Sequence, residues 1–348
     1  MAFLRNTWYC AGWSADLGAD DLNARILLNE PVLLYRKEDG TPVAIGDRCP
    51  HRFAPLHLGR KQGDCVACPY HGLVYGPSGE CVHNPHGKGV IPARARVPSY
   101  LLVERYDALW IWMGDPSLAD PAQIPDFSDS SARPGWGHVR GYLDVPVPYE
   151  MVTDNLMDLG HVPYLHTFLA SQGPLPDGFR EERALKQDGD IVWSMHRNLN
   201  TVLNPLFKLL WTDAPEIVEG YFDMRWTPPS NLLLQAGAAK MDGRREDGAR
   251  TPMAHLLTPA TESRTHYFWS QARNRRTDEP AIDEQMKAGI DHAFRNEDEA
   301  MLKQCFELMG TTDLLSLQPV LMPGDGPAMR VRKILAARIE AEGKGAAA

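Results

Sequence analysis

The amino-acid sequence predicts an α+β fold in two domains, an N-terminal all-β domain and a C-terminal domain with an antiparallel sheet and flanking helices. The first third of the chain shows short strand patterns separated by turns, whereas residues 279–309 carry apolar residues at helical spacing. A length of 348 residues also favours roughly two domains. We expect the domains to be residues 1–115 and 136–348, with a proline-rich linker at 116–135.

The individual strands and helices follow from local patterns. In the first domain, β-rich runs flank an Asp-Gly turn and recur before the linker, at residues 31–36, 42–47 and 108–113. In the second domain, residues 145–170 change to helical spacing, and strand patterns return between residues 220 and 274. That region predicts a hairpin of 253–258 with 265–271, and later helices are expected at 279–309 and around 329–339.

Composition excludes several classes of protein. Hydrophobic residues make up 43% of the chain and charged residues 23%, which is ordinary for a globular protein. The formal charge of −9 argues against a nucleic-acid or anionic-membrane partner. The start of the chain, MAFLRNTWYC, lacks the pattern of a secretory signal, and no apolar run is long enough for a membrane span. We therefore expect a soluble cytoplasmic protein.

Two Cys/His pairs predict a metal cluster in the first domain. Cys49 and His51 form one pair, and Cys68 and His71 form the other sixteen residues later. Each pair can project from one loop tip, so two facing loops would supply two thiolates and two imidazoles. Zinc accepts the same ligand set, but zinc sites usually group Cys with Cys and His with His. One cysteine and one histidine in each loop favour a two-iron cluster instead.

Other cysteines and histidines of this domain have simpler interpretations. Cys65 forms a C-x2-C pair with Cys68 and offers a rival ligand, although a small, partly buried side chain is its better interpretation. His57, His83 and His86 are interpreted as polar loop residues. Four ligands therefore remain for the cluster.

A second metal site is indicated between residues 154 and 166. Asn155, Asp158 and His161 would share one face of a helix, whereas His166 would point elsewhere on a straight helix. Pro163 can kink or end the helix and so return His166 toward His161. Two histidines and one carboxylate form the facial triad of non-haem Fe(II) oxygenases. Glu297 and Asp298 both border an apolar helix face, and periodicity leaves both open as the carboxylate.

These motifs together resemble those of the Rieske non-haem iron oxygenases. The segments D-R-C-P-H-R and C-P-Y-H-G resemble the Rieske signature, N-L-M-D-L-x-H-x4-H resembles the catalytic iron motif, and residues 294–298 resemble its F-x-x-E-D segment. The resemblance extends over essentially the whole chain. It implies a helix-grip catalytic domain, thiolates of Cys49 and Cys68 on one iron of a [2Fe-2S] cluster and imidazoles of His51 and His71 on the other. It also implies a mononuclear Fe(II) held by His161, His166 and Asp298.

The chain looks most similar to oxygenase components of vanillate and dicamba O-demethylases and of toluenesulfonate methyl-monooxygenase. This implies a flavin and iron-sulfur reductase that delivers NAD(P)H-derived electrons, O2 as oxidant, and hydroxylation of a methyl or methoxy group of a small aromatic acid. On a methoxy group the product collapses and releases formaldehyde. Hydroxylation of another methyl group and ring dioxygenation are alternatives within the enzyme class. A Rieske electron carrier and a zinc-stabilised structural protein are non-enzymatic ones.

The same resemblance suggests an assembly and further site residues. Relatives form head-to-tail homotrimers, in which Asp158 would bridge His71 of a neighbouring chain to His161. Asn155 and Asp158 are therefore the candidate catalytic residues. Candidate substrate contacts lie on strands expected to face the cavity: His255, Gln235 and Trp269.

Overall fold

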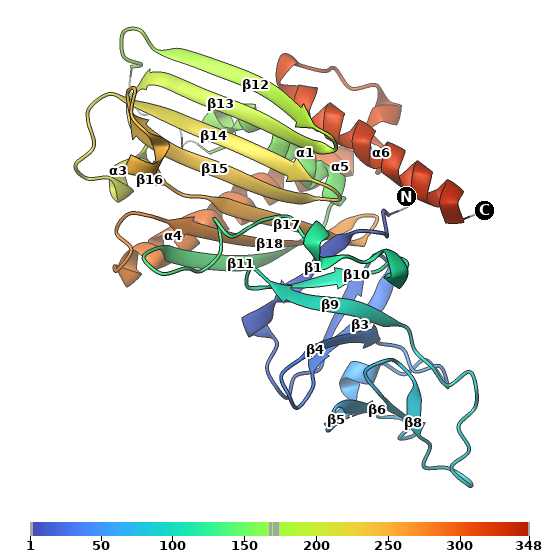
Figure 1. The fold of residues 1–348 in the computed structure, drawn as a ribbon. Helices are drawn as coiled ribbons and strands as arrows, with labels where there is room; N and C mark the ends of the chain where they lie inside the picture. The colour runs from blue at the N-terminus through green and yellow to red at the C-terminus, as the bar shows by residue number, and fades with distance from the viewer. Residues whose placement is uncertain (1–2, 167–168, 170–173, 347–348) are drawn as a thin grey trace. The chain divides into compact units, whose positions relative to one another are not determined.

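The structure is a computed structural model that describes residues 3–166, 169 and 174–346, and its ribbon is shown in Figure 1. The chain divides into two compact units. One comprises Phe3–Ile124 with Thr258–Thr261, and the other comprises Pro125–Leu257 with residues 262–346. Within these described residues, no helix is both long and apolar enough to cross a bilayer.

The N-terminal unit consists of two antiparallel sheets, which confirms the all-β prediction. A six-stranded sheet has the order β1-β10-β9-β4-β3-β2, and a four-stranded sheet has the order β5-β6-β7-β8. The strands are β1 (Trp8–Trp13), β2 (Asn23–Leu27), β3 (Glu30–Arg36), β4 (Pro42–Gly46), β5 (Arg60–Gln62), β6 (Cys65–Ala67), β7 (Val74–Tyr75), β8 (Cys81–His83), β9 (Ser99–Arg105) and β10 (Ala108–Trp112).

Buried side chains from both sheets form one core in this unit. Leu33 and Tyr35 of β3 pack with Val66 of β6 and Tyr75 of β7. Several further members of the core lie in loops, and Cys49 and Cys68 are among them. The loops that carry the two Cys/His pairs are therefore anchored in the core by their cysteines.

The second unit is built on an eight-stranded antiparallel sheet. Seven strands follow the order β11-β18-β17-β15-β14-β13-β12, and β16 pairs with β15. The strands are β11 (Gly137–Val145), β12 (Arg180–Asp188), β13 (Ile191–Thr201), β14 (Val218–Thr227), β15 (Asn231–Lys240), β16 (Ala249–Arg250), β17 (Met253–Thr261) and β18 (Arg264–Arg273). The predicted hairpin is confirmed as β17 and β18.

Helices pack against this sheet, as the expected α+β class requires. Helix α4 contacts β11, α6 contacts β13 and α1 contacts β14. The helices are α1 (Tyr149–Met157), α2 (Val162–Leu165), α3 (Pro205–Leu210), α4 (Pro280–His292), α5 (Glu299–Met309) and α6 (Gly326–Ala346), and a π-helical segment (Ala293–Asp298) joins α4 to α5. The predicted segment 145–170 ends partly outside the described residues.

The sheet register defines which residues face the helices. Leu143 is paired with Tyr267, and Gly141 is paired with Trp269. A Cβ atom on Gly141 would lie 2.4 Å from the Trp269 ring, so glycine makes room for the indole. Residues two apart on one strand share a face, so Tyr267 and Trp269 lie on the same side, and Lys287 of α4 lies over the Trp269 ring. We call this the inner face.

Candidate metal centres

The two Cys/His loops of the N-terminal unit have equivalent backbones. The N–H of Phe53 donates to the carbonyl of Cys49 at 2.9 Å, and the N–H of Gly72 donates to the carbonyl of Cys68 at 3.1 Å. Each donor lies four residues after its cysteine and has a positive φ, 58° at Phe53 and 72° at Gly72. A tight turn therefore follows each cysteine and presents the histidine at its tip.

The ligand types are separated by depth. The thiols of Cys49 and Cys68 are buried, and burial raises the pKa of the Cys68 thiol, while backbone N–H groups of Tyr70 and His71 oppose that rise. The rings of His51 and His71 lie outside, with centroids 4.4 Å apart. Two inner thiols and two adjacent outer imidazoles fit a two-iron cluster with different ligands on each iron.

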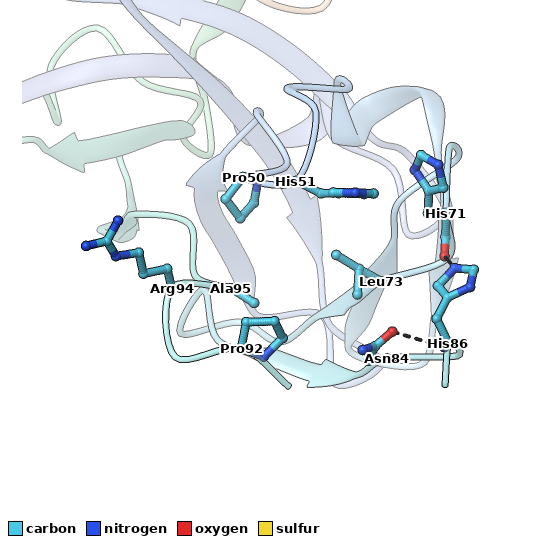
Figure 2. A pocket seen from close by; sticks show the side chains of 9 residues that line it. All are labelled: Pro50, His51, His71, Leu73, Asn84, His86, Pro92, Arg94 and Ala95. Carbon is cyan, nitrogen blue, oxygen red and sulfur yellow. Dashed lines mark hydrogen bonds between the residues drawn. The ribbon is translucent and has the colours of Figure 1, made fainter. Parts of the chain in front are cut away.

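A hollow of about 440 Å³ adjoins the two imidazoles, as Figure 2 shows. His86, interpreted from sequence as a polar loop residue, lies on its wall and contacts the His71 carbonyl through Nε2 at 2.7 Å. Cys65 lies within β6 opposite Gln62, outside the two loops. The structure thus brings together the four residues expected from the sequence.

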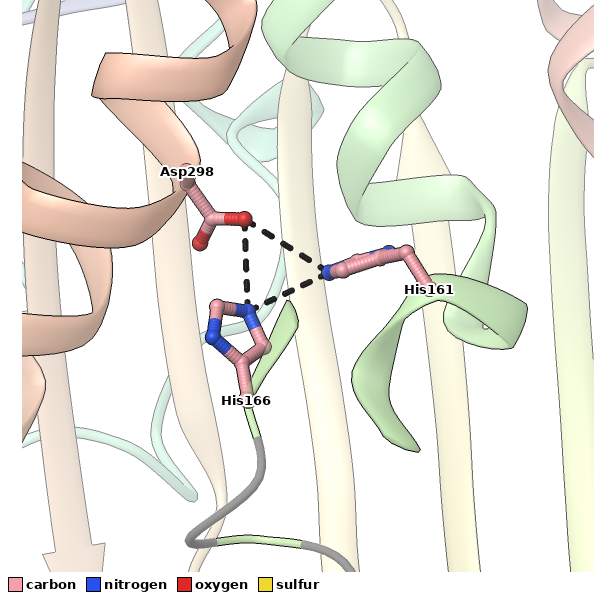
Figure 3. Close-up of side chains that lie close together, drawn as sticks. All are labelled: His161, His166 and Asp298. Carbon is pink, nitrogen blue, oxygen red and sulfur yellow. Dashed lines mark hydrogen bonds and ion pairs between the residues drawn. The ribbon is translucent and has the colours of Figure 1, made fainter. Parts of the chain in front are cut away.

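In the second unit, three side chains expected from the sequence converge on one point (Figure 3). His161 Nε2 lies 3.2 Å from His166 Nε2 and 3.6 Å from Asp298 Oδ1. His166 Nε2 lies 3.2 Å from the same carboxylate oxygen. His166 and Asp298 are buried and His161 is half-buried. Two neutral imidazoles and one carboxylate on one side of a point suit a metal with open coordination positions.

The backbone break that aligns the histidines differs from the expected one. Helix α1 ends at Met157, and Asp158 has extended backbone angles. The Asp158 carboxylate then accepts the Gly160 N–H at 2.8 Å and caps a new 3-10 turn that contains His161. Pro163 lies in the first turn of α2, where proline is favoured, so it starts a helix and does not end one. The prediction of a kink at Pro163 was therefore wrong in position.

The π-helical segment positions two adjacent acids around one imidazole. Asp298 faces His166 Nε2, while Glu297 Oε2 lies 2.7 Å from His166 Nδ1. Such π segments are frequent at functional sites. Periodicity left Glu297 open as the metal ligand beside Asp298, and it did not predict this contact with the Nδ1 side of His166. The only available signal was that both acids border the apolar side of the helix.

Hydrogen bonds donated by Nδ1–H orient both histidines toward the same point. The Nδ1–H of His161 faces the backbone carbonyl of Asp158, and that of His166 faces Glu297. These contacts leave both Nε2 lone pairs for a metal. Burial lowers the pKa of His166, but the carboxylates of Asp298 and Glu297 outweigh it and raise that pKa. A site with this negative field favours a cation.

The two candidate catalytic residues lie beside the triad in different ways. Asn155 Nδ2 donates to Asp298 Oδ1 at 3.1 Å, so it orients the carboxylate. The Asp158 side chain does not contact the His161 ring as expected, because its backbone carbonyl occupies that position. The helix break at Asp158 causes this change, since Asp158 becomes the cap of the 3-10 turn that contains His161 and its carboxylate bonds the Gly160 N–H instead.

Models of two protein families match this chain. Residues 7–100 match the Rieske [2Fe-2S] domain, and residues 145–341 match the vanillate O-demethylase oxygenase C-terminal domain. The chain belongs to the Rieske oxygenases. Its cofactors are therefore a Rieske [2Fe-2S] cluster and a mononuclear non-haem iron, and the donor sets described above fit both groups.

Relatives of this Rieske oxygenase match over nearly their full length. The oxygenase component of chloroacetanilide N-alkylformylase from Rhizorhabdus wittichii is 37% identical over 98% of this chain and 97% of its own. The oxygenase component of dicamba O-demethylase from Stenotrophomonas maltophilia is 36% identical over 96% and 97%. A crystal structure of dicamba monooxygenase bound to 3,6-dichlorosalicylic acid matches with a TM-score of 0.91 and 34% identity, covering 99% of both chains.

His255, one of the three candidate substrate contacts in this Rieske oxygenase, lies beside the triad. It is 2% exposed, its ring centroid lies 5.8 Å from that of Phe294, and the Asp298 carboxylate acts on it electrostatically. No hydrogen-bond partner for its Nε2 is found among the described residues. Trp269 shares the inner face, where Lys287 of α4 lies over its ring, and its buried Nε1 likewise has no hydrogen-bond partner among the described residues.

The sheet register contradicts the prediction that Gln235 faces the substrate cavity. Leu232 is paired with His255, so it shares the inner face, and Gln235, three residues later, points to the other side. There its amide donates to Asp129 at 2.8 Å. Which face of the sheet Gln235 occupies cannot be read from the sequence without the strand pairing. The structure therefore removes Gln235 from the candidate substrate contacts.

Proposed function

We propose that this chain hydroxylates an alkyl carbon bound to a heteroatom of a small aromatic acid, and that on a methoxy group this releases formaldehyde. The observation that carries the proposal is the buried polar atom of His255 on the inner face beside the His161, His166 and Asp298 triad. A substrate that contacts His255 would lie close to the metal. The chain's share of the reaction is to position that substrate and to exclude water.

The metal ligands follow from the two sites. Cys49 and Cys68 would hold one iron of the Rieske cluster, and His51 and His71 the other, within a domain of residues 1–115. His161, His166 and Asp298 would hold the mononuclear iron within a domain of residues 136–348, after a linker at 116–135. Bound there, that iron supplies the O2 activation that side chains cannot perform.

Names of relatives favour attack on an alkyl group over attack on the ring. One relative is named as an N-alkylformylase and another as an O-demethylase. The shared feature is an alkyl group on a heteroatom. Ring dioxygenation and benzylic hydroxylation are therefore outcomes of the test, not parts of the proposal.

Electrons must arrive from a separate protein, since the relatives are named as oxygenase components. We propose a reductase with a flavin and an iron-sulfur centre, and a head-to-tail homotrimer in which the cluster of one chain serves the iron of the next. Asp158 would accept a hydrogen bond from the neighbour's cluster ligand. One Asp158 oxygen accepts the Gly160 N–H, and its other oxygen has no donor among the described residues.

The test is product analysis with purified oxygenase, a reductase and NADH. A panel of methoxybenzoates, N-methylated anilides, methylated arylsulfonates and simple arenes would be offered. We expect formaldehyde from a methoxylated aromatic acid, one per O2 consumed. If only benzylic alcohols or cis-diols appear, the dealkylation proposal fails while the oxygenase assignment survives.

A further inference from the structure

His255 and Tyr267 form an isolated polar pair within the apolar inner face. His255 lies on β17 and Tyr267 on β18, and the Tyr267 hydroxyl lies 2.6 Å from His255 Nδ1. Both side chains are buried, and the ring of Phe294 packs on each of them. The Asp298 carboxylate acts electrostatically on both groups, which places the pair beside the iron triad.

Counting hydrogens decides the direction of this hydrogen bond. If His255 Nδ1–H donated to the tyrosine oxygen, the hydroxyl hydrogen and the Nε2 lone pair would both be buried without partners. If the hydroxyl donates to Nδ1, the hydrogen moves to Nε2, and only that N–H lacks a partner. A buried unpaired polar group costs about 1–3 kcal/mol, so the second arrangement is favoured.

We propose that Tyr267 is a positioning residue that holds His255 in the Nε2–H tautomer, and that this N–H donates to an acceptor oxygen on the substrate. The inference rests on the proposed function and names the substrate class more closely. A neutral N–H recognises a carbonyl, carboxylate or sulfonyl oxygen, and it does not require a negative charge on the substrate. The site therefore selects acceptor-bearing aromatics and not anions alone.

The charge state of the pair agrees with this geometry. Burial lowers the pKa of His255 to about 3, although the Asp298 carboxylate opposes that shift. Burial also raises the pKa of Tyr267. Tyr267 from β18 and Asp298 from the π-helical segment are the titratable groups that the described residues place against His255. The imidazole therefore stays neutral, and the hydroxyl keeps its proton at working pH.

Equilibrium binding to the iron-loaded enzyme tests the inference without turnover. Calorimetry would measure Kd for benzoate and for benzamide, its neutral analogue, between pH 6 and 8.5. In the wild-type enzyme we expect the two Kd values to agree within about tenfold and the benzamide Kd to stay flat with pH. A preference for benzoate above a hundredfold, a benzamide Kd that changes tenfold across this range, or binding of neither compound would overturn the inference.

Variants then test the role of the hydroxyl. Tyr267→Phe removes it, and we expect both Kd values to rise about tenfold. Tyr142→Phe is the matched control, because it removes a hydroxyl that bonds His266 Nδ1 at 2.8 Å on the opposite face of the same sheet. This control should leave both Kd values unchanged. Iron content and the Rieske spectrum verify folding of each variant.

Repeating Tyr267→Phe in a His255→Gln variant separates the positioning role of the Tyr267 hydroxyl from its packing role. His255→Gln supplies an amide N–H that has no tautomer, so adding Tyr267→Phe to it should weaken binding little further. If Tyr267→Phe weakens binding equally in both backgrounds, or not at all in the wild type, tautomer control is wrong. Because the ligands are not turned over, these results are independent of whether formaldehyde is produced.

Discussion

Arg332 of α6 is expected to be essential for the stability of the catalytic domain. Its guanidinium lies 2.6 Å from the carboxylate of Asp154 and 2.7 Å from that of Glu150, both on α1. The side chain of Arg332 is 9% exposed, and those of Asp154 and Glu150 are 20% and 16% exposed. Arg332→Ala would leave two poorly solvated carboxylates without their cation. Breaking a buried pair in this way costs about 3–5 kcal/mol, and the residual exposure favours the lower end.

Urea unfolding of the metal-loaded enzyme would measure this loss. Arg338→Ala on the same helix is the matched control, because Arg338 pairs with Asp190 and both side chains are 45% exposed. An exposed pair contributes about 0–1 kcal/mol, so the control should unfold almost as the wild type does. Equal losses in the two variants would refute the reasoning. A weaker α1 should also disturb Asn155, the neighbour of Asp154, and hence its bond to Asp298.

The pH dependence of this loss has a definite sign. Burial raises the pKa of both Glu150 and Asp154, while Arg332 opposes the rise. Without Arg332 these carboxyl groups bind protons more readily in the folded chain than in the unfolded chain. Stability then increases as pH falls. We expect the deficit of Arg332→Ala to shrink between pH 7.5 and 5.5, and a deficit that grows on acidification would contradict this.

Two further predictions concern the metal ligands. Replacing His51 or His71 by Cys should lower the cluster midpoint potential in the molecules that still assemble it, because thiolate donates more negative charge than imidazole. Protein-film voltammetry would measure the change, and an unaltered potential would argue against both residues as ligands. Glu297→Gln should weaken retention of the mononuclear iron by about 10–100-fold in chelator competition, since Glu297 orients His166. Retention equal to that of the variant Glu299→Gln, on the other side of Asp298 in the sequence, would refute that role.

Features that depend on local spacing were predictable from the sequence. The Cys/His pairs act within single turns, so Cys49, His51, Cys68 and His71 could be grouped before the fold was known. The hairpin of β17 and β18 and the helix after residue 279 also follow local periodicity. The fold class and the family resemblance were confirmed for the same reason.

Features that depend on pairing or capping were not predictable. Helix α1 ends before Asp158, whose side chain caps the next turn, whereas the sequence predicted the helix break at Pro163. The side of the sheet on which Gln235 lies is set by the β15–β17 register, and local sequence patterns do not encode that register. Glu297 gained a partner only because the π-helical segment turns it toward His166, 131 residues earlier.

Iron quantification combined with electron paramagnetic resonance tests the two-centre account most directly. The wild-type oxygenase should bind three irons per chain and show a Rieske signal when reduced. Asp298→Ala should bind two irons per chain and keep the Rieske signal unchanged, because the substitution removes one ligand of the mononuclear site only. Three irons in Asp298→Ala, or a lost Rieske signal together with normal folding, would contradict the account.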